Sequence, residues 1–179
     1  MKPFKPSSKV EEFACSIDFE DGFLFANYHL RGSLDNLIVR SKSGQPLFKD
    51  ELWKATVFEI FLKKENAKQY YEWNLCPSTF YASYLFESYR EPQPPSKISS
   101  GIPEVIHYHC SSSRLDFNVK IPLPSELLEC NEFKIQISAI LDFDGQDEKE
   151  FFALKHPGDQ ADFHNQECFQ CVSKVDGID

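Results

Sequence analysis

Short apolar runs that alternate with polar residues recur along most of the chain, and this pattern predicts β-strands. Successive side chains of a strand point to opposite faces, so the alternation also assigns residues to faces. Turn residues separate the runs, as is typical of a sandwich. The strands are predicted at 23–30, 34–40, 56–62, 69–76, 81–89, 105–110, 114–121, 133–143 and 150–154. At most a short turn of helix is expected, at 125–129. The sequence therefore predicts an all-β protein, an antiparallel β-sandwich with little helix.

Two of these runs show the alternation clearly. In 69–76, Tyr71 and Trp73 share one face, which makes Trp73 a core candidate, while Glu72 and Asn74 share the other. Glu72 and Asn74 are expected to face outward or to line a groove. The run 114–121 has a fully apolar face, made of Leu115, Phe117, Val119 and Ile121.

The run 56–62 is apolar on both faces except at Glu59, which lies between Val57 and Phe61 on one of them. A carboxylate in such surroundings is costly unless it is hydrogen-bonded or paired. Two interpretations stay open. Glu59 is either a structural partner of an Arg or Lys, or a ligand-binding group in a cleft.

Composition limits the protein to one domain and excludes some partners. A chain of 179 residues with 17 Phe, 7 Tyr and 2 Trp has enough bulk for one core, so a single β-sandwich domain is expected over 1–179. The net charge of -9 and the pI of about 5.1 disfavour nucleic acid and anionic membranes, which need clustered Lys and Arg.

The chain shows no targeting or membrane segment. Its N-terminus lacks the apolar run of a signal peptide, and no later segment approaches the ~20 apolar residues of a membrane helix. A cytoplasmic location is therefore expected, and the 6 Cys are expected to form no disulfides.

Motifs for catalysis and cofactors are weak. Cys168 and Cys171 form a CxxC with His164 four residues before it, but three ligands do not complete a zinc site. Phosphate-binding and nucleophile-elbow motifs are missing, and Glu59 with Glu72 carries no sign of a glycosidase acid. We expect no catalytic residues, no metal and no cofactor.

Aromatic residues beside polar ones suggest a recognition surface instead. Trp53 stands at the entrance to a strand, an awkward place for a core residue, and Tyr81 begins a later strand. Aromatic faces stack on the apolar side of a sugar ring while Asn, Glu and Arg bond its hydroxyls. The alternative is that Trp53 packs over the end of the sandwich.

The ordered motifs between Leu52 and His164 resemble the DOMON-like domains related to family-nine carbohydrate-binding modules. The resemblance covers about 110 residues. It rests on LW at 52–53, FEIFL at 58–62, YEWNLCPS at 71–78, YLF at 84–86, YR at 89–90, ALKHP at 153–157 and DFH at 162–164.

The resemblance implies a β-sandwich whose relatives bind sugars or haem and are mostly not enzymes. It implies that Trp53 stacks on a saccharide while Glu59, Asn74 and Arg90 hydrogen-bond to it. Further motif positions without a stated role are His156, Asp162 and His164.

This chain departs from the family patterns in four ways. Sugar modules use two Trp residues, whereas Trp73 is assigned to the core here. Tyr81 stands where several relatives carry Trp, and Thr79 where they often carry Gly. Haem-binding relatives use Met and His, and Met1 is the single methionine.

We therefore expect a noncatalytic domain that binds a small saccharide or sugar derivative. The candidate ligand-binding residues are Trp53, Glu59, Asn74, Arg90, Tyr81, His156, Asp162 and His164. One alternative is a metal- or haem-binding, redox-related protein that uses His156, Asp162 and His164. Another is a protein-interaction module whose motif residues only stabilise the fold. The sequence names no protein partner.

Overall fold

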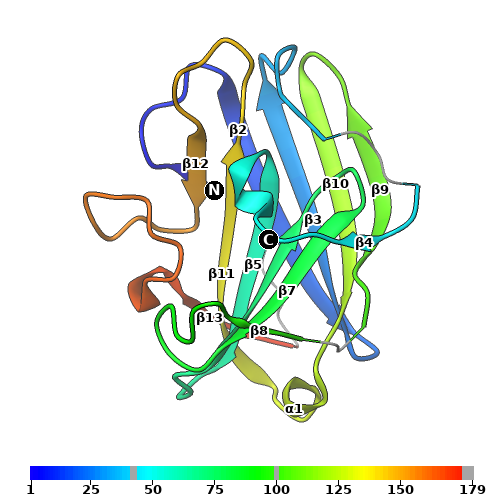
Figure 1. Cartoon of the computed structure of the whole chain (residues 1–179), viewed down its shortest axis with the longest axis vertical. Helices are drawn as coiled ribbons and strands as arrows, with labels where there is room; N and C mark the ends of the chain where they lie inside the picture. The colour runs from blue at the N-terminus through cyan, green and yellow to red at the C-terminus, as the bar shows by residue number, and fades with distance from the viewer. Residues whose placement is uncertain (41–43, 99–100, 175–179) are drawn as a thin grey trace.

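The computed structural model describes residues 1–40, 44–98 and 101–174. Two β-sheets pack face to face, as predicted (Figure 1). The smaller sheet has the order β2-β3-β10-β9. Its strands are Val10–Glu20 (β2), Phe23–Gly32 (β3), Glu104–Cys110 (β9) and Arg114–Pro122 (β10). All of its pairings are antiparallel.

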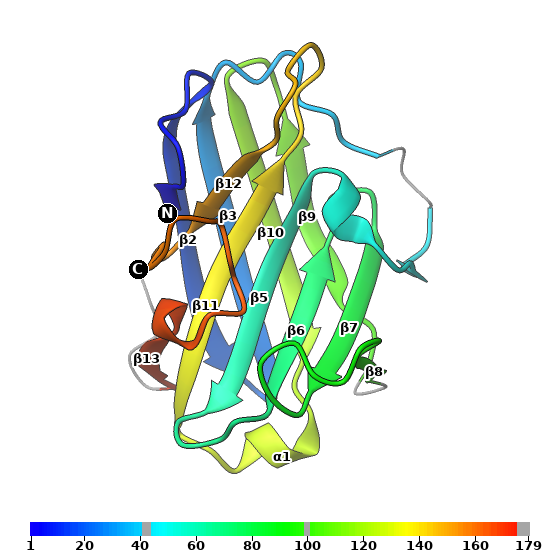
Figure 2. The same cartoon turned by 60° about the vertical axis from the view of Figure 1, so that its left-hand side comes forward.

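The larger sheet has the order β1-β12-β11-β5-β6-β7-β4, and it faces the viewer in Figure 2. Its main strands are Val57–Lys64 (β5), Tyr70–Leu75 (β6), Phe80–Phe86 (β7), Glu132–Leu141 (β11) and Glu150–Ala153 (β12). Short strands extend its edges: Lys2–Pro3 (β1), Leu47–Phe48 (β4), Ser96–Lys97 (β8) and Gln170–Ser173 (β13). Of the described pairings, the one between β4 and β7 is parallel and the rest are antiparallel.

The main core lies between the two sheets. Phe58, on the inner face of β5, is fully buried. Its ring centroid lies 4.8 Å from that of Tyr28 and 5.0 Å from that of Phe117, both on the smaller sheet. Trp73 is 1% exposed in the same core, as the alternation predicted. Burial of these large rings supplies most of the force that holds the sheets together.

One predicted strand is absent and one long strand was not predicted. The run 34–40 forms no strand; its single ladder contact is an isolated bridge from Leu37 to Phe143. Conversely, β2 is one of the longest strands and was not predicted. A two-residue turn joins β2 to β3, with Asp21 at φ 49° and Gly22 at φ 81°. Positive φ at both positions is the geometry that hairpin turns favour.

Little of the chain is helical. The predicted helical turn is present as Ser125–Leu128 (α1), at the lower end of the sandwich in Figure 2. Two 3-10 turns complete the elements, Leu52–Lys54 (η1) and Gln166–Cys168 (η2). Residues 154–169, here called the strap, leave β12 and cross the outer face of the larger sheet (Figure 2). Below this cover lies a second apolar cluster that includes Phe61, Tyr70 and Phe163.

Candidate functional site

Polar side chains gather on the outer face of the larger sheet, which water would normally reach. Glu59 on β5 is paired in register with Ser138 on β11 and with Asn74 on β6. Glu72, two residues before Asn74, shares this face because strand side chains alternate. Gln136 lies on it as well, two residues before Ser138. The five side chains form a continuous polar group, here called the polar cluster.

The polar cluster is buried. The exposed fraction is 3% for Glu59, 6% for Glu72 and 1% for Asn74, while Ser138 and Gln136 are fully covered. Carboxylates with so little exposure are rare in folded proteins unless they are paired. Their burial here demands a compensating set of partners.

Only part of the hydrogen-bonding capacity is used. The Ser138 hydroxyl donates to Glu59 Oε2 at 2.8 Å, and Asn74 Nδ2 donates to Glu72 Oε1 at 2.6 Å. Glu72 Oε2, Asn74 Oδ1 and both amide atoms of Gln136 are buried and have no partner. An unpartnered buried polar atom costs about 1–3 kcal/mol, so a bond to these atoms from a ligand or an ordered water would stabilise this part of the sheet.

Burial changes the acidity of the two carboxyls. Desolvation raises the pKa of Glu59 well above its ordinary value, and the nearby charge of Glu72 raises it further. Desolvation also raises the pKa of Glu72, against the hydrogen bond from Asn74 and the charge of Arg90. The two groups share an environment that opposes negative charge.

Arg90 and the strap meet at the rim of the polar cluster. Arg90 Nη2 lies 2.9 Å from Asp162 Oδ1, and the Tyr89 hydroxyl donates to Asp162 Oδ2 at 2.8 Å. These bonds lower the pKa of Asp162 although burial opposes the change. Arg90 has φ 55°, a conformation that non-glycine residues adopt at a cost of about 1–3 kcal/mol. The tight turn thus aims its guanidinium at the strap.

His164 connects the strap to the sheet. Its Nδ1 lies 2.8 Å from the Tyr70 hydroxyl, which also accepts a bond from the Arg90 backbone N–H at 3.1 Å. Desolvation lowers the pKa of His164 to about 3, so the ring is neutral at pH 7. The direction of the bond between the Tyr70 hydroxyl and Nδ1 depends on the ring tautomer, and Nε2 lies 3.8 Å from Glu72 Oε2.

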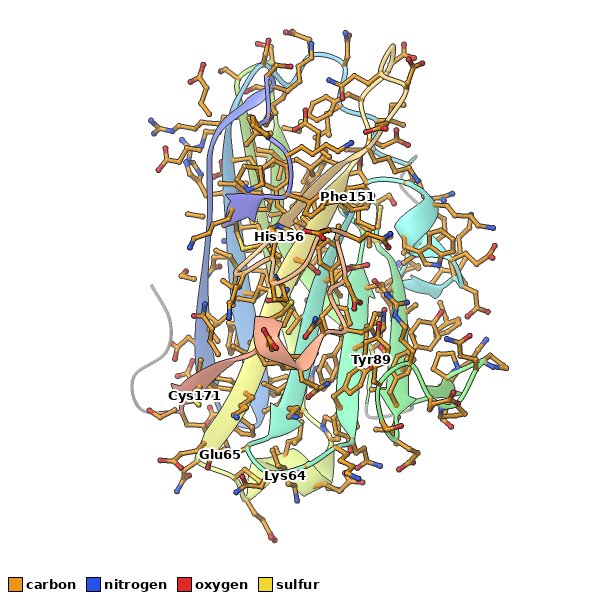
Figure 3. The ribbon with its side chains drawn as sticks, turned by 90° about the vertical axis from the view of Figure 1, so that its left-hand side faces the viewer. Lys64, Glu65, Tyr89, Phe151, His156 and Cys171 are labelled. Carbon is orange, nitrogen blue, oxygen red and sulfur yellow. The ribbon has the colours of Figure 1, made fainter. Side chains whose placement is uncertain are left out.

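The structure brings five of the eight predicted site residues together. Glu59 and Asn74 lie in the polar cluster, and Arg90, Asp162 and His164 lie at its rim. Figure 3 shows this face of the molecule. It labels Tyr89, which precedes Arg90 in the sequence, and His156, which lies on the strap near β1.

The other three lie apart from this group. Trp53, on η1, is 52% exposed; its ring lies 5.5 Å from Lys54 Nζ, and its carbonyl accepts a bond from Lys149. Tyr81 packs against the main core, on the opposite face of β7 from Ala82. His156 bonds the carbonyl of Lys2 at 3.0 Å and packs on Phe4. Tyr81 and His156 therefore do not line the polar cluster.

Several residues of the site were not among the predicted ligand-binding residues. Glu72 lies within the motif at 71–78, and its alternation with Trp73 placed it on the correct face. Gln136 and Ser138 interrupt the apolar run of β11, and this interruption was the available signal. Tyr70 gave no polar signal, because an aromatic residue at a strand start resembles core.

An open cleft adjoins the strap on the η1 side. It has a volume of about 560 Å³, within the range of small-ligand sites, and Phe4 and Phe151 contribute its aromatic walls. Lys149 lines the cleft and also donates to the Trp53 carbonyl. The cleft is lined by the N-terminal segment, residues 148–151 and the strap, and it is linked to Trp53 through the Lys149 hydrogen bond.

The described residues contain no arrangement typical of a metal site and no helix that could span a membrane. Among them, no three His, Cys, Asp or Glu side chains are arranged to hold a metal ion. In the CxxC, Cys168 is buried and Cys171 is exposed, and all six cysteines are free thiols. No helix within the described ranges has the length and apolar character needed to cross a membrane.

Comparison with known proteins gives a structural match. No family model matches the chain, and no curated protein matches it. A solved structure from Bacteroides uniformis, named a "putative carbohydrate-binding protein", is similar with a TM-score of 0.65 and 13% sequence identity. The match covers 97% of this chain and 79% of that chain. At this identity the likeness shows the fold alone.

Proposed function

We propose that this domain is a noncatalytic module that binds a small carbohydrate or sugar derivative over the polar cluster. The observation that carries the proposal is the set of unpartnered buried atoms, Glu72 Oε2, Asn74 Oδ1 and the Gln136 amide. A saccharide presents many hydroxyls that both donate and accept hydrogen bonds. Such a ligand satisfies these atoms more fully than an apolar one.

We place Trp53 at the edge of this site as a stacking surface, because its turn η1 packs against β6, the strand that carries Glu72 and Asn74. Its ring is 52% exposed although Leu52 beside it is buried. An exposed Trp near polar groups is suited to the apolar face of a sugar ring. The motif resemblance to family-nine carbohydrate-binding modules and the name of the structural neighbour support the same ligand class.

The placement of the two carboxyls favours binding over glycoside hydrolysis. A glycosidase sets its acid and its second carboxylate on either side of the scissile bond. Glu59 and Glu72 instead rise from neighbouring strands of one flat face, so a saccharide resting there meets both from the same side. Their side chains are also engaged by Ser138 and Asn74.

Calorimetry on ligands selected from a glycan array tests the proposal. We expect Trp53→Ala to weaken saccharide binding by about 1–3 kcal/mol and to leave the thermal midpoint nearly unchanged, because an exposed ring contributes little to the core. Asn74→Ala should weaken binding by a similar amount through its lost hydrogen bonds.

Ile106→Ala is the matched control for Trp53→Ala, since Ile106 is 53% exposed on β9 of the other sheet. This control should bind like the wild type. The proposal fails if no saccharide binds the wild type, or if Trp53→Ala unfolds the domain.

A further inference from the structure

The polar cluster buries two carboxyl groups whose hydrogen bonds come from the neutral side chains of Ser138 and Asn74. Glu59 and Glu72 belong to paired strands, with Asn74 opposite the first and two residues from the second. They are close enough for the charge of Glu72 to act on Glu59. An isolated ionised carboxylate in a dry site is unstable without a nearby positive charge.

The cationic side chains around the cluster are engaged elsewhere. Arg90 forms its ion pair with Asp162 at 2.9 Å, and Lys63 donates its ammonium hydrogen bond to Gln166 on the strap. His164, whose Nε2 lies 3.8 Å from Glu72 Oε2, is uncharged at neutral pH. Arg90 acts on the two glutamates only at a distance.

Neutral donors near the cluster are also committed. The Tyr84 hydroxyl, opposite Glu72 in the ladder, donates to Asp50 at 2.7 Å instead. Asp50 is in turn bound by Lys97 on β8. The Tyr70 hydroxyl is bonded to His164 Nδ1. Within the described residues, no side chain donates to Glu72 Oε2.

Two of the unpartnered atoms are acceptors, and Gln136 adds one donor and one acceptor. An ionised Glu72 can only accept at Oε2, and Asn74 turns its amide nitrogen toward Glu72, which leaves Oδ1 as its free atom. A primary ammonium offers three donors and no acceptor. A hydroxyl offers one donor, and its lone pairs are repelled by the lone pairs of these oxygens.

We propose that the ligand of this site is an amino sugar, whose ammonium group is held by Glu59, Glu72 and Asn74 Oδ1. The proposal rests on the proposed function and specifies its ligand class. The ammonium supplies a positive charge, which the side chains of Ser138 and Asn74 that bond the two carboxylates do not carry. The sugar ring then lies toward Trp53, and its hydroxyls face the rim.

Three disaccharides with the same β-1,4 backbone test the proposal by calorimetry at pH 7. They carry a hydroxyl (cellobiose), an ammonium (the glucosamine disaccharide) or an acetamide (diacetylchitobiose) at C2. We expect the ammonium compound to bind about tenfold to a hundredfold more tightly than the other two, the range of a charge-assisted hydrogen bond.

Proton release gives an independent readout. Binding a cation favours the ionised carboxylates, so protons leave the cluster when the amino sugar binds. Titrations in buffers of different ionisation enthalpy should therefore show net release for the amino sugar and none for cellobiose. Equal proton balance for both ligands would contradict the role of the carboxylates.

Substitutions then show which residues cause the preference for the amino sugar. Glu59→Gln and Glu72→Gln keep the shape and remove the charge, and each should reduce the preference for the amino sugar at least tenfold. Glu11→Gln, the same change at an exposed position of β2, should leave it unchanged. Thermal unfolding of each variant shows that the fold is retained.

The outcomes separate the two proposals. If cellobiose or the acetamide binds as well as the amino sugar, the ammonium inference is wrong and the carbohydrate proposal stands. If the preference survives in both glutamine variants, the ammonium is held elsewhere and the inference is also wrong. If no saccharide binds at all, the proposed function itself fails.

Discussion

Glu59 is a carboxyl group on a central strand, and its burial predicts how stability depends on pH. Desolvation and the charge of Glu72 raise its pKa above the ordinary 4.5. The folded protein then holds more protons than the unfolded chain, so its free energy of unfolding falls as pH rises from about 4.5 toward neutrality and above. We expect Glu59→Gln, which can still accept from Ser138, to stabilise the fold by about 1–4 kcal/mol at pH 8.

Chemical denaturation at pH 5 and pH 8 checks this expectation. The gain should be largest at pH 8 and small at pH 5, where most of the wild-type carboxyl is already protonated. Glu11→Gln on the exposed face of β2 serves as the control and should change neither value by more than about 0.5 kcal/mol. A destabilised Glu59→Gln at pH 8 would show that the ionised carboxylate has a partner stronger than Ser138.

The sequence identified Glu59 as unusual but not its partner. Its position between Val57 and Phe61 was enough to show a carboxyl in apolar surroundings. Ser138, however, is 79 residues away along the chain and becomes a neighbour only through the register of β5 with β11. Such non-local pairing has no local pattern. Similarly, Thr79 was noted where relatives often carry Gly, and its φ of 71° gives the physical reason for that preference.

The strap is the element that closes the candidate site, and Tyr70 is its main polar attachment to β6. The Tyr70 hydroxyl accepts from the Arg90 backbone N–H and bonds His164 Nδ1. Tyr70→Phe removes both bonds and leaves two polar groups unsatisfied. We expect a loss of about 1–3 kcal/mol in the free energy of unfolding. Hydrogen exchange should accelerate in residues 154–169 more than in β5 or β11.

Tyr108→Phe is a matched control on β9, where no strap contact exists among the described hydrogen bonds. It should leave exchange in the strap unchanged. If Tyr70→Phe instead accelerates exchange evenly across the larger sheet, the hydroxyl stabilises the whole sheet and the strap does not move as a separate unit.

Elements with clear alternation were predictable, and elements defined by contacts were not. The strand 114–121 was recovered as β10, with Leu115 and Phe117 fully buried. β2 carries the same signal, with Phe13, Cys15 and Ile17 on one face, and could have been found from it. The run 34–40 is apolar because Leu34 and Leu37 pack on the core from a loop. The path of the strap depends on Asp162 and His164 finding partners on other elements, which a linear pattern does not show.

At the scale of the whole molecule, one core joins both sheets, and this predicts cooperative unfolding. Phe58 of the larger sheet is fully buried against Phe13, Tyr28 and Phe117 of the smaller one. Phe58→Ala removes the ring from both sheets at once and leaves a cavity. We expect it to lower the free energy of unfolding by about 3–5 kcal/mol.

Denaturant unfolding followed by far-UV circular dichroism and by tryptophan fluorescence measures this effect. Because Trp73 lies in the shared core and the dichroism reports both sheets, the two curves should coincide in the wild type and shift together in Phe58→Ala. Phe23→Ala is the control: Phe23 is half-buried under Lys120, on the outer face of the smaller sheet, and should cost no more than about 1 kcal/mol. Separate transitions for the two probes would mean that one sheet persists without the other. The candidate site would then sit on a sheet whose stability does not depend on the shared core.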